Sequence, residues 1–192
     1  MPRIDVSRYP PAIRELLSPP RVAELGPGRP NQGAFEQLRG LSRDSMAPAA
    51  PLADPLMADA CIAGLWLYHD FLDRSHSLSQ EIETTTGSYW HGIMHRREPD
   101  ASNAKYWFRR VGQHPVFAEL CDSARCLAVE TGADGAAAFL TTQQNWDPFA
   151  MIDLVERART GAQPEHVALC ERVQQSEWDL LFAFCYRSAV GK

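Results

Sequence analysis

Histidine and carboxylate side chains recur at helical spacing in two neighbouring segments. The two sets, each with offsets i, i+4 and i+7, are His69, Asp73 and His76, and His91, His95 and Glu98. A repeat of 3.6 residues places such positions on one helix face, and helices joined by a short connection pack antiparallel. Facing imidazole and carboxylate groups hold zinc, iron or manganese in helical bundles. We therefore predict metal ligands at His69, Asp73, His76, His91 and His95.

The alternative is that these histidines cap helices or hydrogen-bond to buried backbone and carboxylates. An HxxxH spacing is common by chance, and the residues between His91 and His95 lack the glutamate of the HExxH zinc-protease pattern. Three serines around His76 also weaken the prediction that the first helix continues that far. The sequence alone does not distinguish a metal site from histidines that serve only the fold.

A basic and aromatic segment adjoins the second histidine pair. Residues 91–110 hold five basic and two acidic side chains in a chain whose net charge is −5. Arginine pairs bidentately with carboxylate or phosphate and stacks on aromatic rings. We predict a site for a small anionic or polar molecule formed by Arg96, Arg97, Tyr106, Arg109 and Arg110. The alternative is surface arginines paired with acids elsewhere in the chain.

The segment 81–90 combines carboxylates, hydroxyls and aromatic rings immediately before His91. Loops of this composition often line ligand sites, so Trp90 is a candidate for stacking on a ligand. Glu81 and Glu83, together with Glu98, are candidates for general acid and base. These residues predict a second, metal-free kind of pocket, although alternate carboxylates in a loop are more often solvated.

The elements that must position these side chains are predicted to be helical. Ten of the fourteen prolines lie in the first 55 residues, which predicts an irregular arm over 1–53 with short helices at 11–17 and 33–41. Asp54 and Asp147 each precede a proline and fit the N-cap of a helix. We expect a helical domain over 54–192 with helices at 55–76, 88–97, 103–111, 115–129, 148–159 and 164–190, and a loop at 81–88. The fold class is therefore all-α: a single-domain helical bundle with a proline-rich N-terminal arm.

Composition narrows the function further. A chain of 192 residues fits one domain, and the negative net charge disfavours a nucleic-acid partner. No apolar run approaches the ~20 residues needed to span a bilayer, so we expect no membrane partner. The N-terminus has no hydrophobic signal region and the five cysteines form no CxxC pair, so we expect a cytoplasmic protein with reduced thiols. The GxSxG, GxxxxGK[ST] and GxGxxG motifs are absent.

The stretch 68–110, which contains the segments YHDFLDRSH, SYWHGIMHRRE and NAKYWFRR, covers about a quarter of the chain. This block resembles one found in a family of bacterial and fungal proteins with no assigned activity. The resemblance therefore implies no role for any residue. The residues themselves favour a small-molecule enzyme or binding protein, with metal-dependent hydrolysis as the leading chemistry. The alternatives are the metal-free pocket and a protein–protein interaction module, and a homo-oligomer stays open.

Overall fold

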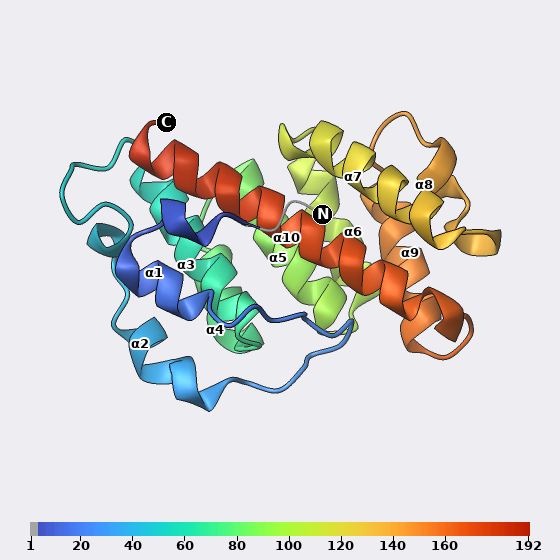
Figure 1. Ribbon diagram of the computed structural model, residues 1–192, viewed down its shortest axis with the longest axis horizontal. Helices are drawn as coiled ribbons and strands as arrows, with labels where there is room; N and C mark the ends of the chain where they lie inside the picture. The colour runs from blue at the N-terminus through green and yellow to red at the C-terminus, as the bar shows by residue number, and fades with distance from the viewer. Residues whose placement is uncertain (1–3) are drawn as a thin grey trace.

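The computed structural model describes residues 4–192, which fold as an all-α domain with no strand in that range (Figure 1). The helices are α1 (Pro11–Leu16), α2 (Phe35–Arg39), α3 (Pro55–Tyr68), α4 (Leu72–Ser79), α5 (Thr85–Arg97), α6 (Ala101–Val111), α7 (Val116–Thr131), α8 (Phe139–Thr142), α9 (Pro148–Arg159) and α10 (Val167–Val190). The predicted fold class is confirmed. The predicted caps are present as well, because Asp54 and Asp147 each accept hydrogen bonds from two amides of the following helix.

Helix α3 is the central element of the bundle. Its sequence is apolar on all sides, and almost every side chain from Met57 to Tyr68 is buried. The long helix α10 packs against it, and the indole Nε1 of Trp178 donates to the carbonyl oxygen of Gly64 at 2.9 Å. A Cβ at Gly64 would lie 2.7 Å from the ring of Trp90, so glycine permits this close approach between α3 and α5.

The N-terminal segment 4–53 packs onto the bundle (Figure 1). Prolines separate the short helices of this segment, and apolar side chains of the segment enter the core. Tyr9 contacts Phe182 of α10 with a centroid distance of 5.3 Å, and Ile13, Leu38 and Met46 are almost completely buried. The N-terminal segment therefore covers the bundle and also contributes buried side chains to the hydrophobic core.

The predicted single helix over 55–76 is wrong. Helix α3 ends at Tyr68, Asp70 takes a left-handed conformation with φ of 64°, and α4 begins at Leu72. A left-handed residue ends the run of helical hydrogen bonds and redirects the chain. His69 consequently caps α3 while His76 lies on α4, and the two do not share a helix face.

The predicted loop over 81–88 is shorter than expected. The hydroxyl of Thr84 accepts a hydrogen bond from the amide of Gly87 at 3.0 Å, and α5 begins at Thr85. A Cβ at Gly87 would lie 2.1 Å from the carbonyl oxygen of Ile82, so this glycine allows the connection to fold tightly against α5. The short link packs α5 against α4, and α6 covers α5 from another side.

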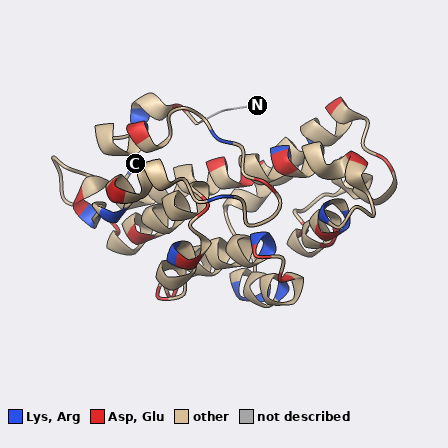
Figure 2. Cartoon of the chain, turned by 90° about the horizontal axis from the view of Figure 1, so that it is seen from below, with Lys and Arg blue, Asp and Glu red and all other residues tan. Residues whose placement is uncertain are grey.

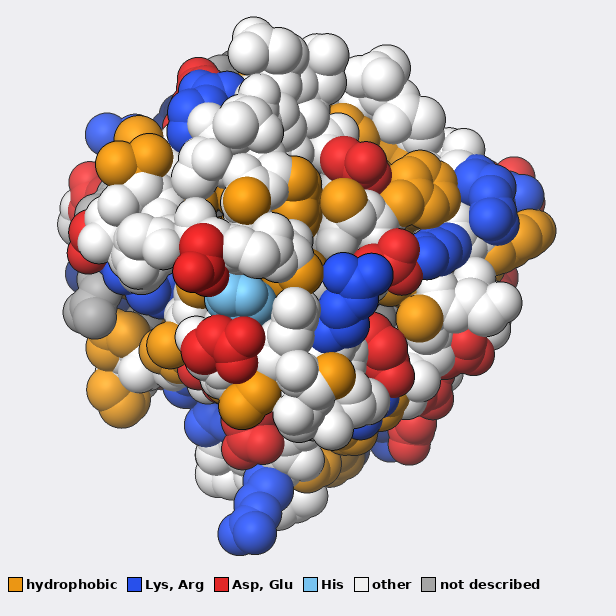
Figure 3. Space-filling model, turned by 90° about the vertical axis from the view of Figure 1, so that its right-hand side faces the viewer, with side chains coloured by type: hydrophobic (Ala, Val, Ile, Leu, Met, Phe, Trp, Pro, Cys, Tyr) orange, Lys and Arg blue, Asp and Glu red, His pale blue; other side chains and the backbone are white. Residues whose placement is uncertain are grey.

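Charged side chains are mixed over the surface. Figure 2 shows acidic and basic positions interspersed along the helices, and the face drawn in Figure 3 has the same mixture. Among the described residues, no helix has the length and apolar character that crossing a membrane requires.

Candidate metal centre

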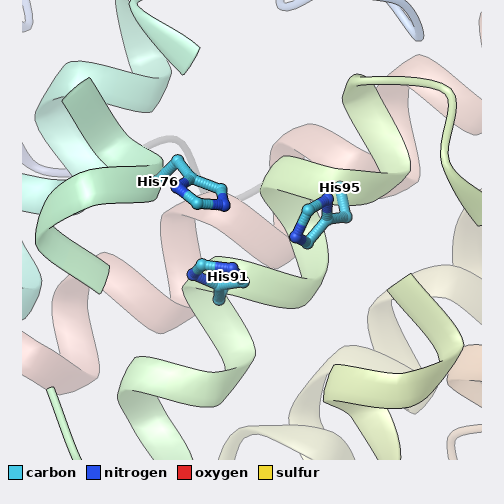
Figure 4. Close-up of side chains that lie close together, drawn as sticks. All are labelled: His76, His91 and His95. Atoms are coloured by element: carbon cyan, nitrogen blue, oxygen red, sulfur yellow. The ribbon is translucent and has the colours of Figure 1, made fainter. Parts of the chain in front are cut away.

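Three histidines from two helices come together beside α6. His76 lies on α4, while His91 and His95 lie one turn apart on α5 (Figure 4). One ring nitrogen from each lies within 4.8 Å of the other two, which identifies the cluster as a group that could hold a metal ion. The ring centroids are 4.5 Å apart for His76 and His91 and 4.8 Å apart for His91 and His95. We refer to these three residues as the histidine cluster.

Hydrogen bonds fix the orientation of two of the three rings. The Nδ1 of His95 lies 3.0 Å from Oε2 of Glu98, and a carboxylate only accepts, so Nδ1 carries the proton. The Nδ1 of His91 lies 2.9 Å from Oγ of Ser79, whose hydroxyl can itself donate to the carbonyl oxygen of His76 at 3.3 Å. Both arrangements favour an unprotonated Nε2, the form of imidazole that binds metal ions.

Burial keeps the imidazoles of His91 and His95 neutral. It lowers the pKa of His91 to about 3, and the nearby His95 and His76 lower it further by repulsion of like charge. Burial also lowers the pKa of His95, against the opposing effect of Glu98. A neutral imidazole offers a lone pair to a cation without first releasing a proton.

The dimensions of the cluster suit a small transition metal after a modest adjustment. Zinc–nitrogen bonds of about 2.0–2.1 Å in a tetrahedral site place the nitrogens ~3.4 Å apart. The nitrogens here lie within 4.8 Å of one another, so at least one ring must move inward. His76 is half-buried, and no hydrogen bond within residues 4–192 fixes its ring. Rotation of this side chain is the simplest closing movement.

Trp107 of α6 packs directly on the cluster. Its ring lies 4.1 Å from that of His91, at an angle of 46°. The guanidinium of Arg110 lies over the same indole at 5.2 Å, whereas that of Arg109 lies over Phe149 at 5.8 Å. Both arginines are exposed, and within residues 4–192 neither has a carboxylate at ion-pair distance. Tyr106 on the same helix is also exposed.

Two of the five predicted metal ligands lie outside the histidine cluster. His69 caps α3, where its Nε2 donates to the carbonyl oxygen of Leu16 and its Nδ1 accepts from the amide of Asn31, each at 3.0 Å. Burial lowers the pKa of His69 to about 4, so the ring is neutral and ties the N-terminal segment to the bundle. Asp73 is exposed in the first turn of α4. The break at Asp70 is the physical reason for both differences.

The predicted ligand-binding residues Arg96 and Arg97 are buried in ion pairs. Arg96 pairs with Glu177 of α10, a carboxylate that also accepts from the hydroxyl of Tyr89 at 3.0 Å. Arg97 pairs with Asp70 at 2.6 Å and donates to the carbonyl oxygen of Leu67 at 2.9 Å. Contrary to expectation, the two guanidiniums anchor the end of α5 to α10 and to the turn between α3 and α4.

The remaining candidates have different positions from those expected. Trp90 is completely buried between Gly64 and Trp178, so it packs the core. Glu81 and Glu83 are exposed, and neither belongs to the histidine cluster. Of the three predicted acid–base residues, only Glu98 contacts a cluster histidine. The metal-free pocket of Trp90 and the two glutamates is therefore not formed.

Sequence reasoning missed two residues that touch the cluster. Ser79 follows His76 by three positions, so recognising α4 as a separate helix would have indicated a shared face. Trp107 comes from α6, and its contact with His91 depends on how α5 and α6 pack. No sequence spacing indicates that second contact.

Comparison of the chain with protein-family models, with curated proteins and with solved structures gives no match. The histidine cluster and the groups around it are therefore the basis for assigning a function.

Proposed function

We propose that this protein binds a divalent transition metal, zinc first, through His76, His91 and His95. The observation that carries the proposal is the convergence of three ring nitrogens within 4.8 Å, with two of the rings held by Ser79 and Glu98. Histidine ligands of metals characteristically donate their second nitrogen to a carboxylate or another polar group.

The three imidazole ligands favour zinc over the iron and manganese that were also expected from the sequence. Iron and manganese sites in helical bundles are rich in carboxylates, and the described cluster contains imidazoles alone. Three histidines leave one coordination position for water, as in catalytic zinc sites. A zinc ion held by these histidines would lower the pKa of such a water to about 7 and would so supply hydroxide for hydrolysis at neutral pH. Zinc-dependent hydrolysis is therefore the reaction class we assign.

An anionic substrate fits the side chains beside the cluster. Arg110 is exposed, has no carboxylate partner within residues 4–192, and is held over Trp107, which itself packs on His91. Arginine held in this way can pair with a carboxylate or phosphate without a large loss of side-chain entropy. We assign Arg110 to substrate recognition, and Glu98 and Ser79 to the positioning of His95 and His91.

Metal content tests the first part of the proposal. Protein purified without a histidine tag and reconstituted with zinc should hold about one equivalent per chain. His76→Asn should lose it, and because the side chain of His76 makes no hydrogen bond within residues 4–192, that variant should remain folded. His166→Asn, a histidine outside the cluster, is the matched control and should bind zinc as the wild type does. Less than ~0.1 equivalent after reconstitution would refute the metal site.

Anion binding to the cobalt-substituted protein tests the second part. Inorganic phosphate should perturb the visible spectrum of bound cobalt, and Arg110→Met should weaken phosphate binding about tenfold, which corresponds to 1.4 kcal/mol. Arg109→Met is the control, because Arg109 lies on the same helix but stacks on Phe149. Equal phosphate affinity in the Arg110 variant and the wild type would remove Arg110 from substrate recognition while leaving the metal site intact.

A further inference from the structure

A polar cavity lies between the N-terminal segment and the end of α3. Its volume is about 210 Å³, and it shares no residue with the histidine cluster. Its polar walls include Glu15, Arg21, Asn31, Gln37 and His69. Pockets for drug-sized ligands begin at about 300 Å³, so an occupant of this cavity must be smaller.

The positive side of the cavity is Arg21, the outer member of a charged triad. The carboxylate of Asp70 accepts from Nη2 of Arg21 at 2.8 Å and from Nη2 of Arg97 at 2.6 Å. Two guanidiniums thus share one carboxylate, and both Asp70 and Arg97 are buried. Glu24 also acts on Arg97, but it is exposed and its charge is screened by solvent. The triad carries a surplus positive charge that a bound anion would balance.

Arg21 is held ready for such an anion. Its backbone amide donates to the hydroxyl of Tyr68 at 2.7 Å, and its Nη2 is fixed by Asp70. Its Nη1 makes no hydrogen bond among the described residues and is not buried. This donor is therefore free to pair with a ligand carboxylate in the cavity.

Other side chains of the cavity wall offer acceptors. Glu15 is exposed and forms no ion pair within residues 4–192; its Oε2 accepts from Nε2 of Gln37 at 3.1 Å. The side-chain carbonyl oxygens of Gln37 and Asn31 make no hydrogen bond in the described chain, because the amide nitrogens make the contacts. An ammonium group has three donors, and these three side chains supply three acceptors, one of them charged.

We propose that this cavity binds a small zwitterion of the α-amino acid class. The carboxylate pairs with Arg21 and the ammonium with Glu15, while the amide oxygens of Asn31 and Gln37 complete its hydrogen bonds. His69 forms part of the wall without adding charge, because both of its ring nitrogens are already hydrogen-bonded. This inference is independent of the proposed metal site.

Titration calorimetry with glycine, L-alanine and L-serine tests the proposal. At least one of them should bind saturably, and propionate and ethylamine, which each carry one of the two charges, should bind at least about tenfold more weakly. Glu15→Gln should weaken amino-acid binding about tenfold without changing the response to propionate. Glu36→Gln is the matched control, because Glu36 is exposed on neighbouring α2, outside the cavity wall, and should bind as the wild type does.

Three results would overturn the proposal. They are the absence of saturable binding by all three amino acids, equal affinity for propionate and L-alanine, and unchanged amino-acid affinity in the Glu15 variant. His76→Asn should retain amino-acid binding, since His76 lies outside the cavity. Loss of zinc with retained amino-acid binding would thus separate the two sites.

Discussion

Replacement of Arg96 by methionine tests whether this arginine serves the fold or a ligand. The side chain of Arg96 is 1% exposed and pairs with Glu177, which is fully buried on α10. Methionine retains most of the apolar volume but leaves the carboxylate of Glu177 without its cation. Tyr89 would remain as a hydrogen-bond donor, and one neutral donor does not offset a buried charge.

The expected loss of stability is large. Removal of one member of a buried ion pair costs about 3–5 kcal/mol, because it leaves the other charge buried and uncompensated, whereas replacement of both members by well-packed apolar residues is often nearly neutral. The pair here is imperfectly satisfied, because Nε and Nη1 of Arg96 have no partner among the described residues. We therefore expect Arg96→Met to lose about 3–5 kcal/mol, or roughly 10 °C in Tm, and the double variant with Glu177→Gln to recover much of it.

Urea unfolding followed by far-UV circular dichroism measures these free energies. Arg39→Met is the matched control, because Arg39 forms an exposed pair with Glu36 and its removal should cost less than about 1 kcal/mol. If Arg96→Met unfolds within about 1 kcal/mol of the wild type, the buried pair does not hold α5 to α10. A double variant less stable than the single one would likewise refute the charge argument.

The remaining predictions concern protonation, packing and the metal site. Burial lowers the pKa of both His69 and His114 to about 4, below the ~6.5 of an unfolded chain, so stability is complete above pH ~6.5 and falls towards pH 4. Each histidine should lower the free energy of unfolding by about 1–2 kcal/mol at pH ~5. His114→Asn should therefore flatten the pH dependence of stability measured by urea unfolding, and an unchanged pH dependence would contradict this. Gly64→Ala should cost about 1–3 kcal/mol through the clash with Trp90, whereas an added methyl at Gly26, which meets open space, should be nearly neutral in the same assay. Glu98→Gln should weaken zinc affinity about 10–100-fold in chelator competition, and equal affinity in this variant and the wild type would exclude positioning of His95 by Glu98.

Local sequence signals predicted much of the secondary structure. The aspartate–proline pairs at 54–55 and 147–148 start α3 and α9, because an N-cap carboxylate and a first-turn proline act within a few residues. The all-round apolar sequence of α3 indicated a buried helix, and α3 is the centre of the bundle. The four-residue spacing of His91 and His95 likewise placed both on one face of α5.

The break between α3 and α4 was not predictable from local patterns. Residues 66–76 continue a helical pattern, but Asp70 leaves it, and its carboxylate pairs with Arg21 and Arg97 from distant parts of the chain. The break separates His69 and Asp73 from the histidine cluster. The first set of matched offsets therefore contributes only His76, whereas the second contributes both His91 and His95.

The sequence by itself determined the helical class, the capped starts of α3 and α9 and the pairing of two histidines on α5, since these depend on interactions within a few residues. Only the tertiary structure decided which helix faces meet. Packing brought His76 to the α5 pair, placed Trp107 against it and buried Arg96 with Glu177. The physical reason is that helical periodicity fixes the directions of side chains around the axis of their own helix. The contacts between different helices depend instead on the packing of the whole core.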